Sequence, residues 1–266
     1  MLKLAGLARS TFYYQQKAAQ AGDKHLALKQ QIGDIYACHK GRYGYRRVTA
    51  AIRQMGKKVN HETVQSLMGT LGLKSLVRPK KYRSYKGEVG NAAPHLLKRQ
   101  FTATGANQKW VTDVTEFKVA GEKLYLSPVM DLYNGEIIAF ETSQRPAFTL
   151  VGSMLKKALG KLKADEQPIL HSDQGWQYRM PAYQRALRER GVIQSMSRKG
   201  NCLDNAAMES FFAVMRSEFF YLNKFASVDE LKIGLSKYIR YYNHDRIKMK
   251  LKGLSPVQYR TQPLAA

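Results

Sequence analysis

In residues 22–74 the apolar positions recur at the spacing of an α-helix. Three stretches, 22–39, 45–55 and 60–71, each place their apolar side chains on one side, and polar or glycine-containing turns separate them. Asn60 precedes the third stretch and is a suitable N-cap. Short helices joined by such turns fit a helix-turn-helix, and an ordinary three-helix bundle with a solvated basic face fits the same pattern.

From Lys109 onward the pattern changes to the apolar–polar alternation of strands. Residues 109–119, 123–132 and 136–142 are predicted as three antiparallel strands, because a glycine-containing turn and an Asn-Gly turn connect them. The later periods predict helices at 148–163, 183–190, 203–220 and 228–243, and short strands at 168–172 and 192–196. Three antiparallel strands followed by alternating helices and strands predict an α/β fold with a mixed sheet.

These patterns divide the chain into five segments. The order is a short remnant of a DNA-binding segment at 1–21, an all-α helix-turn-helix-like domain at 22–74, a basic linker at 75–108, an α/β core at 109–222 and a helical extension of that core at 223–266.

The composition excludes several classes of protein. The chain has 266 residues, of which 44% are hydrophobic, so it can bury a core. It contains no apolar run of about 18 residues and its start is too short for a signal peptide, so a membrane partner is not expected. The two cysteines, Cys38 and Cys202, lack the spacing of a zinc site. Their simplest interpretation is that they are reduced thiols in a cytosolic protein.

The net charge of +24 is concentrated at the front of the chain. Residues 1–108 contain 20 basic and 4 acidic residues, whereas residues 109–200 contain 14 and 10. A basic front half favours a polyanionic partner, and nucleic acid fits best because the basic residues lie among helical patterns. The candidate DNA contacts in the helical region are Arg42, Arg46, Arg47, Lys57 and Lys58. Those in the linker are Lys80, Lys81 and Arg83, where a simply solvated charge run is the alternative.

Three carboxylates fall inside or beside apolar structure. Asp113 lies within a predicted strand, Asp173 ends another, and Glu209 lies on a helix with apolar neighbours. Oxygen ligands of this kind suit Mg²⁺, and two such ions would stabilise the attacking and leaving oxygens of an in-line displacement at phosphorus. Two other acidic residues compete for the same role: Glu116, which alternation places on the opposite face of the same predicted strand, and Asp131, which lies on the adjacent strand.

Each candidate also has a purely structural interpretation. Asp113 can bond to a neighbouring turn, Asp173 can cap the turn that follows it, and Glu209 can pair with Arg216. His171 is interpreted as a satisfied histidine at a strand end rather than as a metal ligand.

Several longer runs together resemble the second-frame product of the insertion-sequence-three family of bacterial transposases. The runs are Trp110-Val111-Thr112-Asp113, His171-Ser172-Asp173-Gln174-Gly175-Trp176-Gln177-Tyr178, Ser195-Met196-Ser197-Arg198-Lys199-Gly200-Asn201-Cys202-Leu203-Asp204-Asn205 and Glu209-Ser210-Phe211-Phe212. Thirty-five residues separate Asp173 from Glu209, as is typical of that family. Further matches lie at Gly41-Arg42-Tyr43-Gly44-Tyr45-Arg46-Arg47, Tyr241-Tyr242-Asn243, Arg246 and Leu254-Ser255-Pro256.

The resemblance implies a ribonuclease-H-like core of the retroviral integrase type, in which Asp113, Asp173 and Glu209 bind the metal and catalyse the reaction. The cofactor it implies is a pair of Mg²⁺ ions, for which Mn²⁺ can substitute. Arg216 stands where the family usually has a phosphate-contacting Lys, and Lys248 stands where many members have His. The family commonly adds an upstream helix-turn-helix and leucine zipper by frameshifting, which this chain is expected to lack.

The leading hypothesis is therefore a DDE-type transposase that cuts and joins DNA at the ends of its insertion sequence. Its expected partners are element-end and target DNA, other copies of itself on that DNA, and an upstream-frame DNA-binding protein or fusion. Its expected location is the bacterial cytoplasm, at the nucleoid when DNA is bound. Two alternatives remain at this stage: a catalytically silent repressor of its own element, and a nuclease acting on RNA–DNA hybrids.

Overall fold

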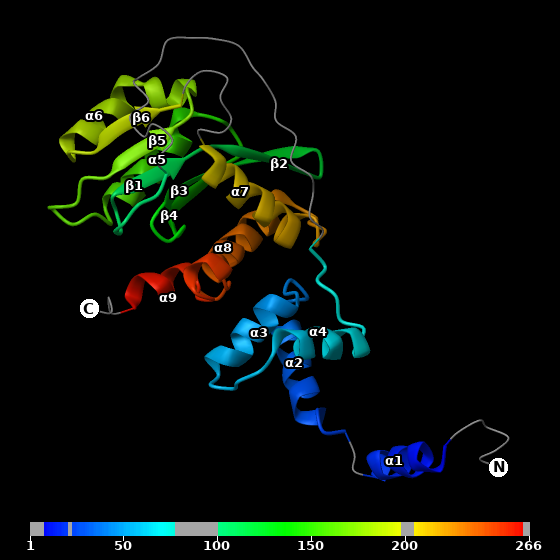
Figure 1. Cartoon of the computed structure of the whole chain (residues 1–266). Helices are drawn as coiled ribbons and strands as arrows, with labels where there is room; N and C mark the ends of the chain where they lie inside the picture. The colour runs from blue at the N-terminus through cyan, green and yellow to red at the C-terminus, as the bar shows by residue number, and fades with distance from the viewer. Residues whose placement is uncertain (1–7, 21–22, 78–100, 198–204, 263–266) are drawn as a thin grey trace. The chain divides into compact units, whose positions relative to one another are not determined.

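The computed structural model describes residues 8–20, 23–77, 101–197 and 205–262. The chain forms two compact units, Met1–Val77 and Arg78–Ala266 (Figure 1). Lys80, Lys81 and Arg83, which are candidate DNA contacts from the linker, lie outside the described residues.

The first unit is helical, as the sequence predicts. Its helices are α1 (Arg9–Gln20), α2 (Leu26–Cys38), α3 (Tyr45–Gln54) and α4 (His61–Thr70). Their fully buried apolar side chains include Ile32 of α2, Ile52 of α3 and Val64 of α4. The predicted N-cap is confirmed, because the Asn60 side chain accepts a hydrogen bond from the Glu62 backbone N–H at 3.2 Å.

The second unit is built on a six-stranded mixed sheet. Its strands are β1 (Lys109–Thr112), β2 (Thr115–Val119), β3 (Glu122–Asp131), β4 (Ile137–Ser143), β5 (Ile169–Ser172) and β6 (Ile193–Met196). The long strand β3 pairs antiparallel with β1, β2 and β4, while β1, β5 and β6 run parallel to one another. The predicted mixed sheet is confirmed.

The prediction of one continuous strand over residues 109–119 is wrong at its centre. The strand stops after Thr112 and resumes at Thr115. The Asp113 carboxylate accepts a hydrogen bond from the backbone N–H of Val114 at 2.7 Å. Such a local side-chain bond competes with the sheet ladder, so the chain bends at the residue that carries the carboxylate.

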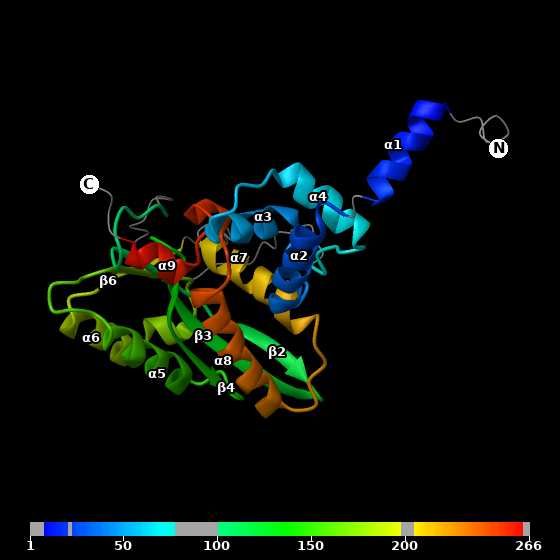
Figure 2. The ribbon, with the colours of Figure 1, turned by 90° about the horizontal axis from the view of Figure 1, so that it is seen from below.

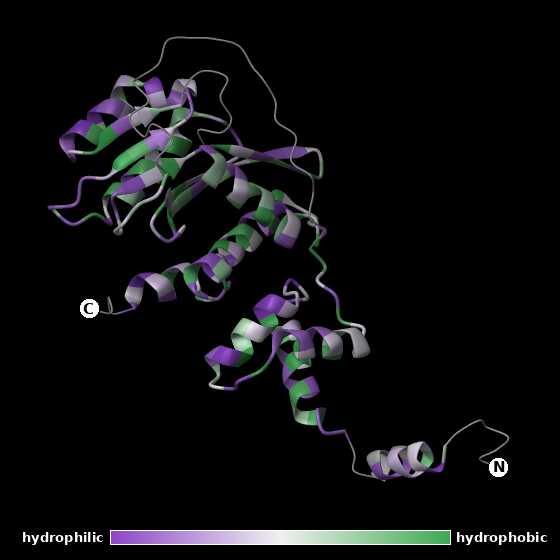
Figure 3. Cartoon of the chain, viewed as in Figure 1, coloured by the Kyte–Doolittle hydropathy of each residue, from purple (hydrophilic) through white to green (hydrophobic). Residues whose placement is uncertain are grey.

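Helices cover both faces of the sheet. On one face α5 (Phe148–Leu159) and α6 (Pro181–Glu189) pack over Trp110, Val129 and Leu170. On the other face α7 (Ala206–Met215) and α8 (Val228–His244) pack over Val111 and Leu126 (Figure 2). Figure 3 shows apolar residues both on central strands of the sheet and on the helices α7 and α8 that pack against it. The shorter helices are η1 (Trp176–Arg179), η3 (Arg216–Phe220), η4 (Met249–Leu251) and α9 (Pro256–Thr261).

The carboxyl-terminal helices protect the edge of the sheet. The Asn243 side chain on α8 donates to the Ile137 carbonyl and accepts from the Ile137 N–H, each at 2.9 Å, so it substitutes for a neighbouring strand on β4. Arg246 forms a bidentate, buried ion pair with Glu218, with both N···O distances at 2.7 Å. No helix in the described part of the chain is long and apolar enough to cross a membrane.

Candidate active site and nucleic-acid interface

The sheet register brings two of the predicted carboxylates to the same level. In the parallel pair of β1 and β5, Lys109 lies opposite Ile169 and Val111 lies opposite His171. The same offset along the chain takes Asp113 to Asp173, so each aspartate directly follows its strand. Because neighbouring strands lie about 4.8 Å apart, the two residues leave the sheet side by side at its carboxyl edge.

Helix α7 brings the third carboxylate to this edge. Asn205 precedes the helix, and its side-chain N–H donates to the carbonyl of Thr112 at 3.2 Å. This bond fixes the first turn of α7, which contains Glu209, next to the strand that carries Asp113. Asn205 is 6% exposed, and its side-chain carbonyl oxygen makes no hydrogen bond with the described residues.

The three carboxylates interact electrostatically. Burial, then the charge of Asp173 and to a smaller extent that of Glu209, together raise the pKa of Asp113 to about 7, against the opposing bond from the Val114 N–H. Burial also raises the pKa of Asp173, although its Oδ1 accepts from the Gly175 N–H at 3.0 Å. Like charges therefore gather in a half-buried place, which is typical of a functional site.

Tyr178 belongs to the same site and was not among the sequence candidates. Its ring is fully buried on η1, and burial, followed by the charges of Asp113 and Asp173, raises the pKa of its phenol. The phenol makes no hydrogen bond of ordinary geometry with the described residues, while the nearby Thr112 hydroxyl donates to Pro128 O at 2.8 Å. Tyr178 and Asn205 both lie in the runs that resemble the transposase family, but no periodicity distinguishes them there.

The competing acidic residues have partners elsewhere. Glu116 lies in an exposed ion pair with Lys123 at 3.0 Å. Asp131 is fully buried opposite Trp110, and its carboxylate accepts from the backbone N–H of Asn107 at 2.8 Å and from Arg260 at 3.2 Å. These contacts assign Asp131 to the structure of the opposite end of the sheet.

His171 is held by hydrogen bonds on both sides of its ring. Its Nδ1 lies 2.9 Å from Ser195 Oγ and its Nε2 lies 3.2 Å from Ser197 Oγ. The prediction of a satisfied histidine is therefore confirmed. It ties β5 to the end of β6.

The site as it stands is not a closed metal cage. No three His, Cys, Asp or Glu side chains among the described residues are gathered tightly enough to hold a metal ion. The donor set nevertheless suits a hard cation, since Asp113, Asp173 and Glu209 offer only carboxylate oxygens. Their mutual repulsion opposes closer approach without a positive charge between them.

Arg216 is bound to the sheet at the far end of α7. Its Nη2 donates to the Thr115 hydroxyl at 2.6 Å and to the Glu116 carbonyl at 3.3 Å, and its guanidinium lies over the Phe117 ring at 5.7 Å. These contacts position the end of α7 on β2, and the predicted phosphate contact stays a prediction.

Basic residues of the first unit collect around the link between α3 and α4. Arg53, Lys57 and Lys58 line a surface hollow of about 630 Å³ together with Gly56, Val59 and Asn60. The hollow is shaped by Arg53, which donates to the Val59 carbonyl at 2.9 Å, and by Lys57, which donates to Gln31 at 2.9 Å. Three cations around one depression suit a phosphate group.

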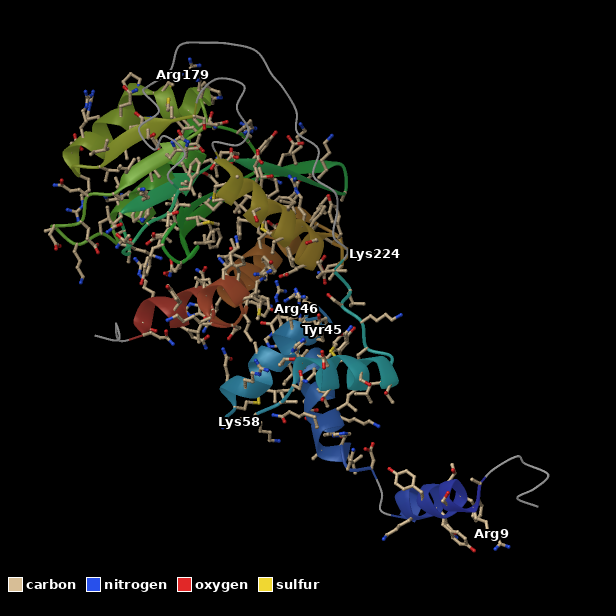
Figure 4. The ribbon with its side chains drawn as sticks, viewed as in Figure 1. Arg9, Tyr45, Arg46, Lys58, Arg179 and Lys224 are labelled. Carbon is tan, nitrogen blue, oxygen red and sulfur yellow. The ribbon has the colours of Figure 1, made fainter. Side chains whose placement is uncertain are left out.

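The other predicted contacts lie at the start of α3. Arg46 is exposed and its guanidinium lies over the Tyr45 ring at 5.6 Å, while Arg47 lies over Tyr43 at 5.4 Å. Arg42 is 8% exposed, so it is less accessible to DNA than the other two. Figure 4 shows Arg46 and Lys58 at opposite ends of α3.

Comparison with known proteins supports the division into a helical unit and an α/β core. Residues 103–202 and 209–264 match integrase core domain families, and residues 23–81 match a helix-turn-helix-like domain family. The chain is 56% identical over 262 residues to the putative transposase InsK for insertion sequence element IS150 of Escherichia coli (strain K12), covering 98% of this chain and 93% of that protein. It is 34% identical to transposase InsF for insertion sequence IS3A of the same organism, covering all of this chain and 94% of that one.

A solved structure shares the fold. A chain of the simian T-cell lymphotropic virus intasome in complex with PP2A regulatory subunit B56 gamma aligns with a TM-score of 0.52 and 15% identity, covering 88% of this chain and 76% of that chain.

The mixed sheet with helices on both faces defines an integrase-type, ribonuclease-H-like core behind a helix-turn-helix-like unit. Its class is the DDE-type polynucleotidyl transferases. The chain belongs to the insertion-sequence-three family of bacterial transposases, as the extent and identity of the two matches show.

Proposed function

We propose that this transposase cleaves and joins DNA at the ends of its insertion sequence by Mg²⁺-dependent in-line phosphoryl transfer. The observation that carries the proposal is the shared level of Asp113 and Asp173 on neighbouring parallel strands, with the charge of Glu209 acting on Asp113. Three carboxylates at one edge of the sheet in a basic protein fit the binding of cations that also contact DNA phosphates.

Asp113, Asp173 and Glu209 would hold two Mg²⁺ ions, with Mn²⁺ as a substitute. When bound, such ions neutralise the developing charge on the oxygens of the reacting phosphate. The residues themselves supply the position: the strand ends fix the aspartates, and the Asn205 bond to Thr112 fixes the start of α7. Because the pKa of Asp113 is raised to about 7, a bound cation would favour the release of the proton from this carboxyl group.

The first unit and its hollow would hold the DNA backbone. Arg53, Lys57 and Lys58 lie around the hollow, and Arg46 is exposed at the other end of α3. Because neutralised phosphates release counterions, we expect affinity to fall steeply with salt. Because two ends are joined in one event, we expect several copies of the chain on the DNA. We also expect an upstream-frame DNA-binding protein or fusion as a partner, and a location in the cytoplasm.

A strand-transfer assay tests the proposal. Purified chain is mixed with a duplex that carries the terminal repeat of its element, in Mg²⁺, Mn²⁺, Ca²⁺ or chelator. Asp113→Asn, Asp173→Asn and Glu209→Gln are expected to bind the duplex and to form no joined product. Glu116→Gln is the matched control, since that carboxylate lies on the next strand in an exposed ion pair and should be dispensable.

The assay also separates the alternatives. Joined product from any of the three substitutions at the wild-type level removes that residue from the site. Binding without divalent-dependent product from the wild-type chain would favour a silent repressor, and preferential cleavage of an RNA–DNA hybrid would favour a nuclease.

A further inference from the structure

The short helix that follows Asp173 presents an aromatic and a basic side chain to solvent. Trp176 is 50% exposed, and Arg179 is exposed at the outer surface of the second unit (Figure 4). Both lie on η1, which is a 3₁₀-helix. Side chains three residues apart eclipse one another on such a helix, so the indole and the guanidinium share one side of η1.

The opposite side of η1 is anchored in the site. Tyr178 is fully buried near Asp113 and Asp173, and its backbone carbonyl accepts a hydrogen bond from Gln194 at 2.7 Å. The turn before η1 is closed by the Gly175 N–H bond to Asp173. The exposed pair is therefore held by a fixed segment rather than by a long loop.

The pair also lies close to the carboxylates. Trp176 is the third residue after Asp173, so their Cα atoms lie within about 11 Å of each other. A half-exposed indole leaves apolar surface in water, and tryptophan at such a place gains most from a flat apolar partner. A neighbouring guanidinium adds attraction for a phosphate.

We propose that Trp176 stacks on a nucleobase next to the reacting phosphodiester, and that Arg179 contacts a phosphate of the same strand. The inference rests on the proposed function, since it requires DNA at the three carboxylates. Nucleobases fit because every base offers a flat face to an aromatic side chain, regardless of sequence. The base can come from the element end or from the target DNA, and both sources present the same chemistry.

Fluorescence of 2-aminopurine tests the stacking directly. One duplex carries the probe beside the reacting phosphate of the terminal repeat, and a second carries it in the target strand. Ca²⁺ replaces Mg²⁺ so that binding is measured apart from cleavage. The variants are Trp176→Ala, Trp176→Phe and Ile193→Ala. Ile193 is also 50% exposed, but it begins β6 opposite Ile169, at the end of the parallel strands away from Asp173.

The wild-type chain and Trp176→Phe are expected to quench the probe in at least one duplex, and Trp176→Ala is expected not to. Strand transfer by Trp176→Ala should fall about tenfold, as one base–aromatic stack implies, while Ile193→Ala stays at the wild-type rate. Quenching in only one duplex identifies the source of the base.

Two results would overturn the proposal: quenching that persists in Trp176→Ala, or its absence with the wild-type chain in both duplexes. A failure of the stacking proposal can be distinguished from a failure of the proposed function, because in the first case the wild-type chain would still form joined product in Mg²⁺. If that product is missing as well, both fail.

Discussion

The two ends of the sheet contain the same kind of residue in opposite circumstances. At one end Asp131 is bound by backbone N–H groups and by Arg260, which also pairs with Glu136 at 2.7 Å. At the other end Asp113 and Asp173 have no cationic partner among the described residues, and each accepts one bond from a nearby backbone N–H. Burial raises the pKa of the aspartates at both ends, so burial alone does not identify the site. The missing countercharge distinguishes Asp113 and Asp173 from Asp131, and it supports the proposed cation site because a bound cation would supply the charge.

The largest expected effect comes from the same substitution made at each end of the sheet, at Asp113 and at Asp131. Asp113→Asn should reduce strand transfer more than about a thousandfold and leave stability unchanged or higher, since a buried repulsion is removed. Asp131→Asn should instead lower the free energy of unfolding by about 2 kcal/mol, because Arg260 loses its buried acceptor, and leave the activity of the folded protein intact. Urea unfolding and the joining assay measure both. Equal losses of strand transfer and of stability in the two variants would show that the two ends do not differ in role.

A second prediction concerns the buried ion pair that secures α8. Glu218→Gln leaves the Arg246 guanidinium without its carboxylate and should destabilise the protein by about 3 kcal/mol. Urea denaturation followed by far-ultraviolet circular dichroism measures the loss. Glu116→Gln, which breaks an exposed pair, is the control and should produce no measurable change. Equal stability of the two variants would show that the buried pair is unimportant.

A third prediction follows from the raised pKa of Asp113. The folded-state pKa is about 7 and the usual value is 3.8, so the folded state holds the proton more tightly than the unfolded state. Without metal, stability should therefore decrease as the pH rises between these two values. Thermal unfolding at several pH values measures it. Asp113→Asn or added Mg²⁺ should flatten this part of the stability–pH profile. If the Asp113→Asn profile is identical to that of the wild-type chain, the titration of Asp113 is not the cause.

The smallest effect is expected at Asn205. Asn205→Ala removes the bond to Thr112 and should cost about 1 kcal/mol, while strand transfer falls about tenfold because α7 is less firmly positioned. Asn223→Ala is the matched control, since its side chain also donates to a carbonyl, that of Phe219, away from the site. If both variants lose activity equally, the Asn205 bond has no positioning role.

Much of this molecule follows from short-range pattern. Alternation and helical spacing predict the sheet strands and the helices from α2 to α8 to within a few residues, and the Asn60 cap is correct. The break at Asp113 was missed because alternation contains no information about a side chain that bonds to its own backbone. The conspicuous Asn243 and Arg246 also had no explanation until the structure showed them at β4 and at Glu218.

The sequence by itself determined the fold class, the family and the three carboxylates, because these depend on residue types at fixed spacings along the chain. Only the tertiary structure decided how the acidic side chains are arranged and which of them have a cationic partner. The register of β1 against β5 sets Asp113 level with Asp173, and Arg260, far along the chain, assigns Asp131 to the other end. Such pairings join distant segments of the chain through packing and strand register. Local periodicity contains no information about them.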